Sequence, residues 1–428
     1  MYRNRKLTLA LIAAFITVLL AAPVFAQMDT LRFCTWNVLN YPERTGASPL
    51  ERYRTVLEAI QPDIFCAQEV MNDAGQNAIL NNVLNVINPG EWATSPNTDA
   101  NLGTNYWKDD SHLYYKTDKI TLLATYLIGT DVRYMKLCKL EIDNGDGSDI
   151  LYVITGHLKA SNTTEDKAER GEEAQAVVNR INTQEFDRAE IIFCGDFNLY
   201  TASEPAWDVL VTNGPFVDPI NRAGSWNNNE SYEDIHTQST RLSSIGDGGS
   251  TGGLDDRFDF ILMTAALNDG FTIEALTNTY WAFGNDGNHF NSDINTGTNS
   301  SVSDQVADAL YYASDHLPVI MDLVQPVTEN SVAERGEALP QGFRILNTYP
   351  NPFNATTTVS MQLSRRSQVH AMLFDVLGRQ VKQVELGAVE PGIQHFSLNA
   401  DELSSGIYLL RISTNFGEIA SNRLVLVR

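Results

Sequence analysis

The sequence has little positive charge for its length. Its 428 residues include 30 lysines and arginines against 53 aspartates and glutamates, which gives a formal net charge of −23 at pH 7. A surface with such an excess of negative charge repels polyanions at long range, which argues against a passive nucleic-acid binder with a basic face. It does not exclude an enzyme that meets phosphate through a bound cation, because the ion reverses the sign of the local field.

Cysteine is also scarce, and the spacing of the four cysteines fits no zinc site. They are Cys34, Cys66, Cys138 and Cys194. Each lies in a short apolar run typical of a strand, where a cysteine packs as a small buried hydrophobe. We therefore expect mostly free, buried thiols, although an even number of cysteines in an exported chain would permit disulfides.

Long hydrophobic runs are missing except near the first residue. There, three basic residues precede an uncharged apolar run over residues 7–22, and residues 24–26 have the small-residue pattern of a cleavage site. This pattern predicts a secretory signal peptide over residues 1–26. An uncleaved membrane anchor is the alternative, which the shortness of the apolar run disfavours.

Short apolar runs alternate with amphipathic patterns over residues 28–325. Residues 50–60, for example, repeat apolar side chains at helical spacing until Pro62, and residues 63–67 then have the composition of a strand. Mixed strands and helices over almost 300 residues predict a layered α/β or α+β domain. Residues 225–256 are rich in Gly, Ser, Asn and Asp, which predicts a long loop that is either mobile or functional.

The pattern changes after this domain. Residues 326–342 show no apolar period, so we expect a linker there. Over residues 343–428 six or seven short strand patterns follow one another, separated by turn residues. This predicts a small all-β, immunoglobulin-like sandwich.

Acids, amides and histidines stand at the ends of the predicted strands of the first domain. They are Asn37, Glu69, His157, Asp196, Asn198, Asp259, Asp315 and His316. One such residue alone is more often a turn former or a satisfied polar group. The full set predicts a polar site at one rim of a sheet, where ligands commonly bind.

Two of these segments carry a resemblance to a known family: GDFN at residues 195–198 and SDH at residues 314–316. With them, residues 28–325 resemble the endonuclease/exonuclease/phosphatase superfamily, in its deoxyribonuclease-like and sphingomyelinase-like branch. The resemblance implies an α+β fold of four layers, an αββα sandwich. It also implies hydrolysis of phosphate esters with Mg²⁺, or with Mn²⁺ or Ca²⁺ in its place.

The resemblance further implies how the metal and the attacking water are held. Glu69 and Asn37 would bind the cation through oxygen, and Asp315 would take a second ion or a water. Asp196 would orient or deprotonate the attacking water. Asn198 would donate hydrogen bonds to the phosphoryl oxygens as charge develops on them.

Two histidines complete the implied site. His316, held by Asp259, would stabilise the transferring phosphoryl group or move a proton. His157 is typical of the deoxyribonuclease-like and sphingomyelinase-like members; the deoxyribonuclease-like members pair it with an acid, and here both Asp109 and Asp110 are candidates.

The long loop contributes two further candidates. His236 and Arg241 precede Asp259 in the sequence, and both are expected to contact substrate phosphate through charge-assisted hydrogen bonds. The alternative is that both belong to a solvated loop.

The tail also resembles a known family. It opens on YPNPFN at residues 349–354 and ends on LVLVR at residues 424–428, as do C-terminal sorting domains of type IX secretion cargo. Ala355 stands where that family often has proline, a minor departure. The resemblance implies a partner, the outer-membrane type IX machinery, and export through the periplasm of a Gram-negative bacterium to the surface or the medium. An adhesive or carbohydrate-binding sandwich is the alternative.

Together these features predict an exported, monomeric, divalent-metal-dependent phosphodiesterase, with extracellular nuclease as the preferred interpretation. A phosphoesterase of lipids or small molecules is the second hypothesis. A non-catalytic surface or adhesion protein is the third, and the complete set of site residues disfavours it.

Overall fold

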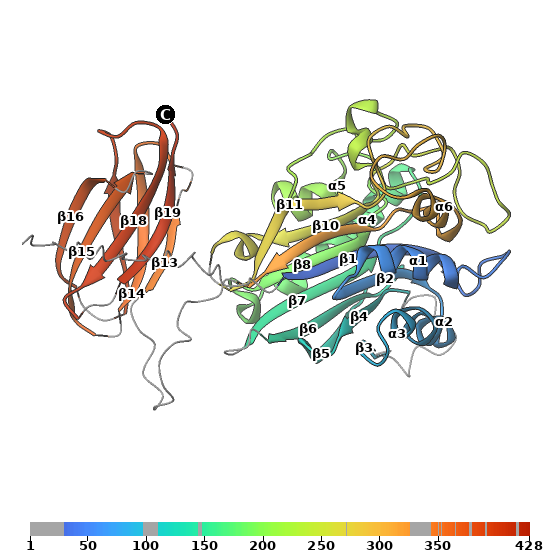
Figure 1. The fold of residues 1–428 in the computed structure, drawn as a ribbon, viewed down its shortest axis with the longest axis horizontal. Helices are drawn as coiled ribbons and strands as arrows, with labels where there is room; N and C mark the ends of the chain where they lie inside the picture. Colours follow the sequence, from blue (N-terminus) through green and yellow to red (C-terminus); the bar gives the residue numbers. More distant parts are fainter. Residues whose placement is uncertain are drawn as a thin grey trace, which may run out of the picture.

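The computed structural model describes two bodies, one mixed and one all-β (Figure 1). The described residues are 30–96, 110–143, 148–270, 272–325, 344–349, 351, 353–363, 365–375, 379–389, 392–416 and 419–428. The predicted signal peptide and linker lie outside them, so both stay predictions.

The first body contains two six-stranded sheets. Sheet A has the order β11-β12-β1-β2-β4-β3 and is formed by β1 (Thr30–Tyr41), β2 (Ile64–Val70), β3 (Trp92–Thr94), β4 (His112–Lys116), β11 (Glu274–Ala282) and β12 (Val319–Val324). Sheet B has the order β5-β6-β7-β8-β10-β9 and is formed by β5 (Ile120–Ile128), β6 (Met135–Asp143), β7 (Ser148–His157), β8 (Glu190–Asp196), β9 (Phe216–Val217) and β10 (Asp259–Thr264).

Helices cover the outer face of each sheet. The main ones are α1 (Leu50–Ile60), α2 (Asp73–Ile79), α3 (Asn85–Ile87), α4 (Thr164–Ile181), α5 (Pro205–Trp207) and α6 (Asp304–Ala313). Residues of α1, α2 and α6 share a buried apolar cluster with sheet A, and residues of α4 and α5 share another with sheet B. A third cluster fills the space between the sheets. The predicted four-layer sandwich is therefore confirmed.

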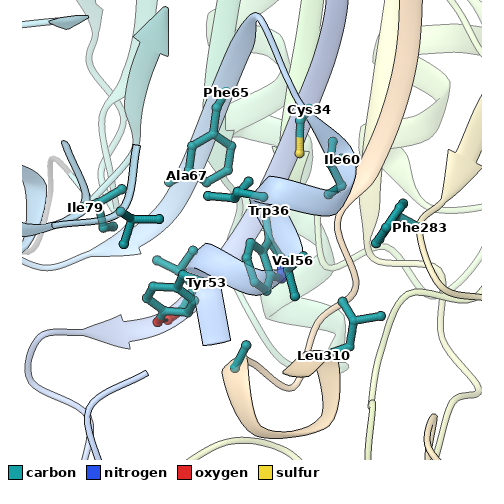
Figure 2. Close-up of a cluster of buried hydrophobic side chains, with 14 of the residues drawn as sticks. Cys34, Trp36, Tyr53, Val56, Ile60, Phe65, Ala67, Ile79, Phe283 and Leu310 are labelled. Carbon is teal, nitrogen blue, oxygen red and sulfur yellow. Dashed lines mark hydrogen bonds between the residues drawn. The ribbon is translucent and has the colours of Figure 1, made fainter. Parts of the chain in front are cut away.

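The packing on sheet A follows from the apolar spacing of α1. Tyr53, Val56 and Ile60 lie on one face of this helix and are almost fully buried. Figure 2 shows them against Trp36 of β1, whose indole nitrogen donates to the backbone carbonyl of His316 at 2.9 Å. Burying a large apolar side chain contributes about 1.5–3 kcal/mol, so this face fixes β1 and, through it, one edge of the site.

All four cysteines are buried and free, as expected from their apolar surroundings. Three of them, Cys66, Cys138 and Cys194, lie in the cluster between the two sheets, and Cys34 packs toward α1. No helix among the described residues is long and apolar enough to cross a membrane.

Some elements of the first body differ from the sequence prediction. The helical segment that follows β2 is not one regular helix, because α2 runs into a π-helical turn over Leu80–Leu84. Neither α6 nor β11 was predicted from the sequence; β11 carries an irregular register between Leu276 and Trp281, which interrupts the alternation typical of a strand.

The second body is a two-sheet sandwich around its own buried core. One sheet has the order β13-β14-β17 and the other β16-β15-β18-β19. The strands are β13 (Arg344–Tyr349), β14 (Thr356–Leu363), β15 (Ser367–Asp375), β16 (Gln380–Val389), β17 (Gly392–Asn399), β18 (Gly406–Thr414) and β19 (Ile419–Leu426). The predicted small all-β sandwich is confirmed.

Candidate active site

Strand register in sheet B brings three site residues into one row. His157 at the end of β7 pairs with Asp196 at the end of parallel β8, and Asp196 pairs with Asp259 at the start of antiparallel β10. Side chains of directly paired residues point to the same face of a sheet. The row of imidazole and two carboxylates therefore follows from the register alone.

A glycine allows β7 and β8 to approach this closely. Gly195 has a φ of 136°, and a Cβ atom at this position would lie 1.9 Å from the carbonyl oxygen of Gly156 on the neighbouring strand. No other residue fits here without moving the backbone of one strand. This explains the glycine of the GDFN motif.

Sheet A supplies the acid and amide that face this row. Asn37 of β1 donates through its side-chain nitrogen to Glu69 Oε1 at 3.0 Å and to Asp196 Oδ2 at 2.9 Å. Glu69, at the end of β2, accepts a second bond from the backbone of Asn40 at 2.8 Å. Asn37 thus connects carboxylates of the two sheets.

Two site residues have left-handed backbone conformations that are unusual outside glycine. Glu69 has a φ of 60° and Asn198 a φ of 50°. Asn198 is fixed by a bond from its backbone nitrogen to Asp196 Oδ1 at 3.0 Å and by one from its side-chain nitrogen to the carbonyl of Leu158 at 3.2 Å. Strained conformations of this kind concentrate at functional sites, where they aim a side chain.

His157 is held between an acid behind it and the acids of the site in front. Its Nδ1 lies 3.0 Å from Asp110 Oδ2, and its Nε2 lies 3.5 Å from Asp196 Oδ2 and 3.9 Å from Glu69 Oε1. Burial and Arg133 act against the charged ring, but Asp110 and Asp196 outweigh them and raise the pKa of His157. Of the two acids considered, Asp110 makes this contact, whereas Asp109 lies outside the described residues.

His316 has the same arrangement on the opposite side of Asp196. Its Nδ1 lies 2.8 Å from Asp259 Oδ2, and its Nε2 lies 3.6 Å from Asp196 Oδ2. Burial lowers the pKa of His316, but the charges of Asp259 and Asp196 raise it further, so the net shift is well above the ordinary value. The contact with the Asp259 carboxylate therefore holds the ring in one orientation.

Groups that could hold a divalent cation are present at the site, but in a different combination from the Asn37, Glu69 and Asp315 that the resemblance implied. The ligand atoms of Glu69, His157 and Asp196 lie within 4.8 Å of one another. Burial chiefly raises the pKa of Glu69, and the charge of His157 opposes that rise. Asp315 is 4% exposed, and its Oδ1 atom is buried without a hydrogen-bond partner among the described residues. The set of Glu69, His157 and Asp196 fits a divalent cation, whereas Asp315 belongs to neither of the two metal-compatible groups found among the described residues.

The two loop residues expected to contact substrate have structural partners instead. His236 is fully buried, its Nε2 lies 2.8 Å from the carbonyl of Trp226, and burial lowers its pKa. Arg241 is also fully buried, in an ion pair with Asp247 at 2.9 Å and a bond to the carbonyl of Tyr311 at 3.1 Å. Neither side chain is open to a ligand in this structure, which corrects the sequence expectation. The glycine-rich loop is packed at these points, not solvated.

Sequence reasoning missed two polar residues at the site. Arg133, in the turn between β5 and β6, places its Nε 3.1 Å from Asp110 Oδ2 and donates to the carbonyl of Leu158 at 3.4 Å. Gln238 lies against His316 and Asp315. Both come from loops without a motif, so no local pattern marks them.

Comparison with known proteins decides the family. Residues 34–316, about two thirds of the chain, match the model of the Endonuclease/Exonuclease/phosphatase family. The chain belongs to this family. Its members hydrolyse phosphate esters and use divalent metals, so the first body is a hydrolase domain.

The tail matches a second model. Residues 347–426 match the Secretion system C-terminal sorting domain, which confirms the resemblance seen in the sequence. This match indicates type IX secretion and a secreted or surface location.

Solved structures to which the chain is similar include D. rerio TDP2 with a single-stranded DNA product, the human Nocturnin catalytic domain and a Bacteroides thetaiotaomicron mannosyl-6-phosphatase. Their identities are 16%, 17% and 15%, and their TM-scores 0.45, 0.40 and 0.40. The matches cover 69%, 70% and 69% of this chain and 99%, 98% and 99% of the respective structures. No curated protein sequence matches the chain.

Proposed function

We propose that this chain is an exported, divalent-metal-dependent phosphodiesterase that cleaves nucleic acid. The proposal rests chiefly on one observation: the two histidines lie symmetrically on either side of the Asp196 carboxylate. His157 and His316 each have Nδ1 against a buried acid, and their Nε2 atoms approach Asp196 Oδ2 at 3.5 and 3.6 Å.

This geometry suits an ester with a poor leaving group, such as a nucleic-acid diester, better than an ester whose leaving group departs easily. Hydrolysis of a phosphodiester needs a positioned water and a proton for the departing alkoxide, which is a poor leaving group. Asp196, between the two rings, is placed to accept a proton from water. His316 or His157, each fixed in orientation by its own acid, is placed to supply one.

The remaining residues hold the phosphoryl group and its charge. Asn198 presents an amide beside Asp196, where charge develops. A divalent cation held by Glu69, with Asn37 and Asp315 nearby, would neutralise phosphoryl oxygens and stabilise the leaving oxygen. Asn37 links Glu69 to Asp196, and this bond keeps the cation ligands and the catalytic row in register.

One observation favours a second candidate, a phosphoesterase of lipid or small-molecule substrates. The net charge of −23 repels a long polyanion but affects a small, singly charged substrate much less. Added salt weakens this repulsion, because the Debye length is about 10 Å at 0.1 M. Nuclease activity that rises with salt before it falls would fit the preferred function.

A substrate panel tests the proposal. Purified protein is assayed with Mg²⁺, Mn²⁺ or Ca²⁺ on plasmid DNA, RNA, sphingomyelin, bis(p-nitrophenyl) phosphate and the monoester p-nitrophenyl phosphate. We expect cleavage of nucleic acid and of the model diester, loss of both in chelator, and recovery with metal. Full activity of metal-stripped protein would refute the mechanism, and activity confined to the monoester would make the enzyme a phosphatase.

A matched pair of histidine variants tests whether the loss of turnover is specific to a histidine of the site. His316→Ala should lower turnover at least about a hundredfold, the usual scale for a proton-transfer group. His370→Ala, in the tail, removes a 42% exposed imidazole and should leave turnover unchanged. Equal effects of the two variants would remove His316 from the proposed mechanism.

A further inference from the structure

A line of polar side chains continues from His316 away from the metal ligands. Gln238 forms two antiparallel β-bridges, one with His316 and one with Asp256. Residues paired in this way point to the same face, so the side chains of Asp256, Gln238 and His316 stand side by side.

Side-chain contacts confirm and extend this alignment. The Gln238 amide nitrogen lies 2.5 Å from His316 Nε2 and 3.4 Å from Asp315 Oδ2. At the other end, Asn227 donates to Asp256 Oδ1 at 2.6 Å. We call Asn227, Asp256 and Gln238 the polar row. It leads from exposed Asn227, through half-buried Asp256 and Gln238, to buried His316.

The chemistry of the polar row suits hydroxyl groups. It offers one carboxylate and two amides, which supply both acceptors and donors, as a hydroxyl requires. Burial raises the pKa of Asp256 to about 7, so at neutral pH this carboxyl either donates or accepts. A second phosphate in this position would meet a carboxylate and no cationic member of the row.

We propose that the polar row is a subsite for the hydroxyl groups of a sugar or polyol whose phosphate ester occupies the catalytic centre. The subsite deepens the proposed function and rests on it, because His316 joins the row to the phosphate site. The hydroxyls have two possible sources, the ribose of RNA and a small sugar or glycerol phosphodiester.

Hydrolysis assays with paired substrates identify the source. A ribonucleotide oligomer is compared with the deoxyribonucleotide oligomer of the same sequence, and a glycerol phosphodiester with bis(p-nitrophenyl) phosphate, which has no hydroxyl group. Asp256→Ala and Asn227→Ala should each lower kcat/KM about tenfold on the hydroxyl-bearing member, mainly through KM, and change the other member less than about twofold. If the two variants lose activity on the ribonucleotide oligomer but not on the glycerol phosphodiester, the subsite binds ribose.

Asp255→Ala serves as the matched control. It removes a carboxylate adjacent in sequence to Asp256. The hydrogen bond from Asn227 goes to Asp256, so the polar row stays intact in this control variant. Asp255→Ala should leave kcat/KM unchanged for both substrates of each pair. If Asp256→Ala lowered kcat/KM equally for both substrates of a pair, or for neither, the proposal would be overturned.

A binding measurement keeps the subsite testable if turnover fails. By calorimetry we expect ribose 5-phosphate to bind the wild-type protein at least about tenfold more tightly than phenyl phosphate, which has the same charge and no sugar hydroxyl. Asp256→Ala should abolish that preference. If no diester is cleaved but the preference persists, the proposed function fails and the subsite stands; if the two ligands bind equally, the subsite fails.

Discussion

Glu190 is the clearest case in which a buried charge should set the pH dependence of stability. It is the first residue of β8, is 7% exposed, and accepts bonds from the backbone of Ile273 at 2.9 Å and from the Thr272 hydroxyl. Burial raises its pKa from 4.5 to about 8, the Ile273 bond opposes the rise, and nearby acids such as Asp149 add to it.

The sign follows from proton binding. Because the folded-state pKa is higher than the unfolded one, the folded state binds more protons between about pH 4.5 and pH 8, so the free energy of unfolding falls as pH rises through this window. For one proton, each pH unit within this window lowers the free energy of unfolding by about 1.4 kcal/mol. The loss by pH 7 is therefore roughly 3 kcal/mol, an upper limit for a group that keeps some contact with water.

Glu190→Gln should abolish this dependence, because the amide keeps an acceptor for Ile273 and Thr272 and carries no charge. We expect a stability gain near zero at about pH 4.5 that grows to roughly 2–4 kcal/mol at pH 8. Urea unfolding followed by tryptophan fluorescence measures it, since all six tryptophans precede residue 325 and report on the first body alone.

A surface variant provides the control. Glu185→Gln alters a carboxylate that is 47% exposed and pairs with Arg180 at 3.4 Å, so its effect should stay within about 0.5 kcal/mol at every pH. A stability difference for Glu190→Gln that is the same at pH 5 and pH 8 would show that Glu190 ionises normally in the folded protein, and the reasoning would fail.

Three further predictions concern the site, the thiols and the tail. Asp196→Ala and His157→Ala should each lower turnover on plasmid DNA, whose leaving group is a poor one, at least about a hundredfold at an unchanged melting temperature; near-normal turnover in a folded variant would contradict the assigned role. Alkylation under denaturing conditions without reductant should label all four cysteines, and a linked peptide pair in the mass map would contradict their free state. A chain of residues 27–330 should retain the specific activity of the longer protein. In the native host, deletion of residues 343–428 should leave the enzyme in the periplasm, and equal extracellular activity would show that the tail does not sort it.

Much of the site could be predicted because its members end buried strands. His157 and Asp196 each follow a run of apolar residues, and parallel neighbouring strands bring such ends together. The choice between Asp109 and Asp110 needed the geometry, because the sequence does not show which of two adjacent acids faces His157.

The polar row and the burial of Arg241 could not be predicted in this way. Gln238 meets His316 across 78 residues of sequence, through a single pair of bridges in a loop. Such contacts depend on how the loop packs against the end of α6, and no periodic pattern in the sequence encodes that packing. The composition of residues 225–256 signalled a loop but not its partners.

The division of the site between the two sheets has a practical consequence. Sheet A supplies Asn37 and Glu69, whereas sheet B supplies His157, Asp196 and Asp259. A chain cut in the turn between β4 and β5 would yield two fragments that each hold part of the catalytic set. The first fragment would carry β1 to β4, and the second would carry sheet B together with β11 and β12 of sheet A. Recovered hydrolysis on mixing would then report fragment association, so this sandwich is suited to a complementation sensor whose signal requires β1 to pair again with β12.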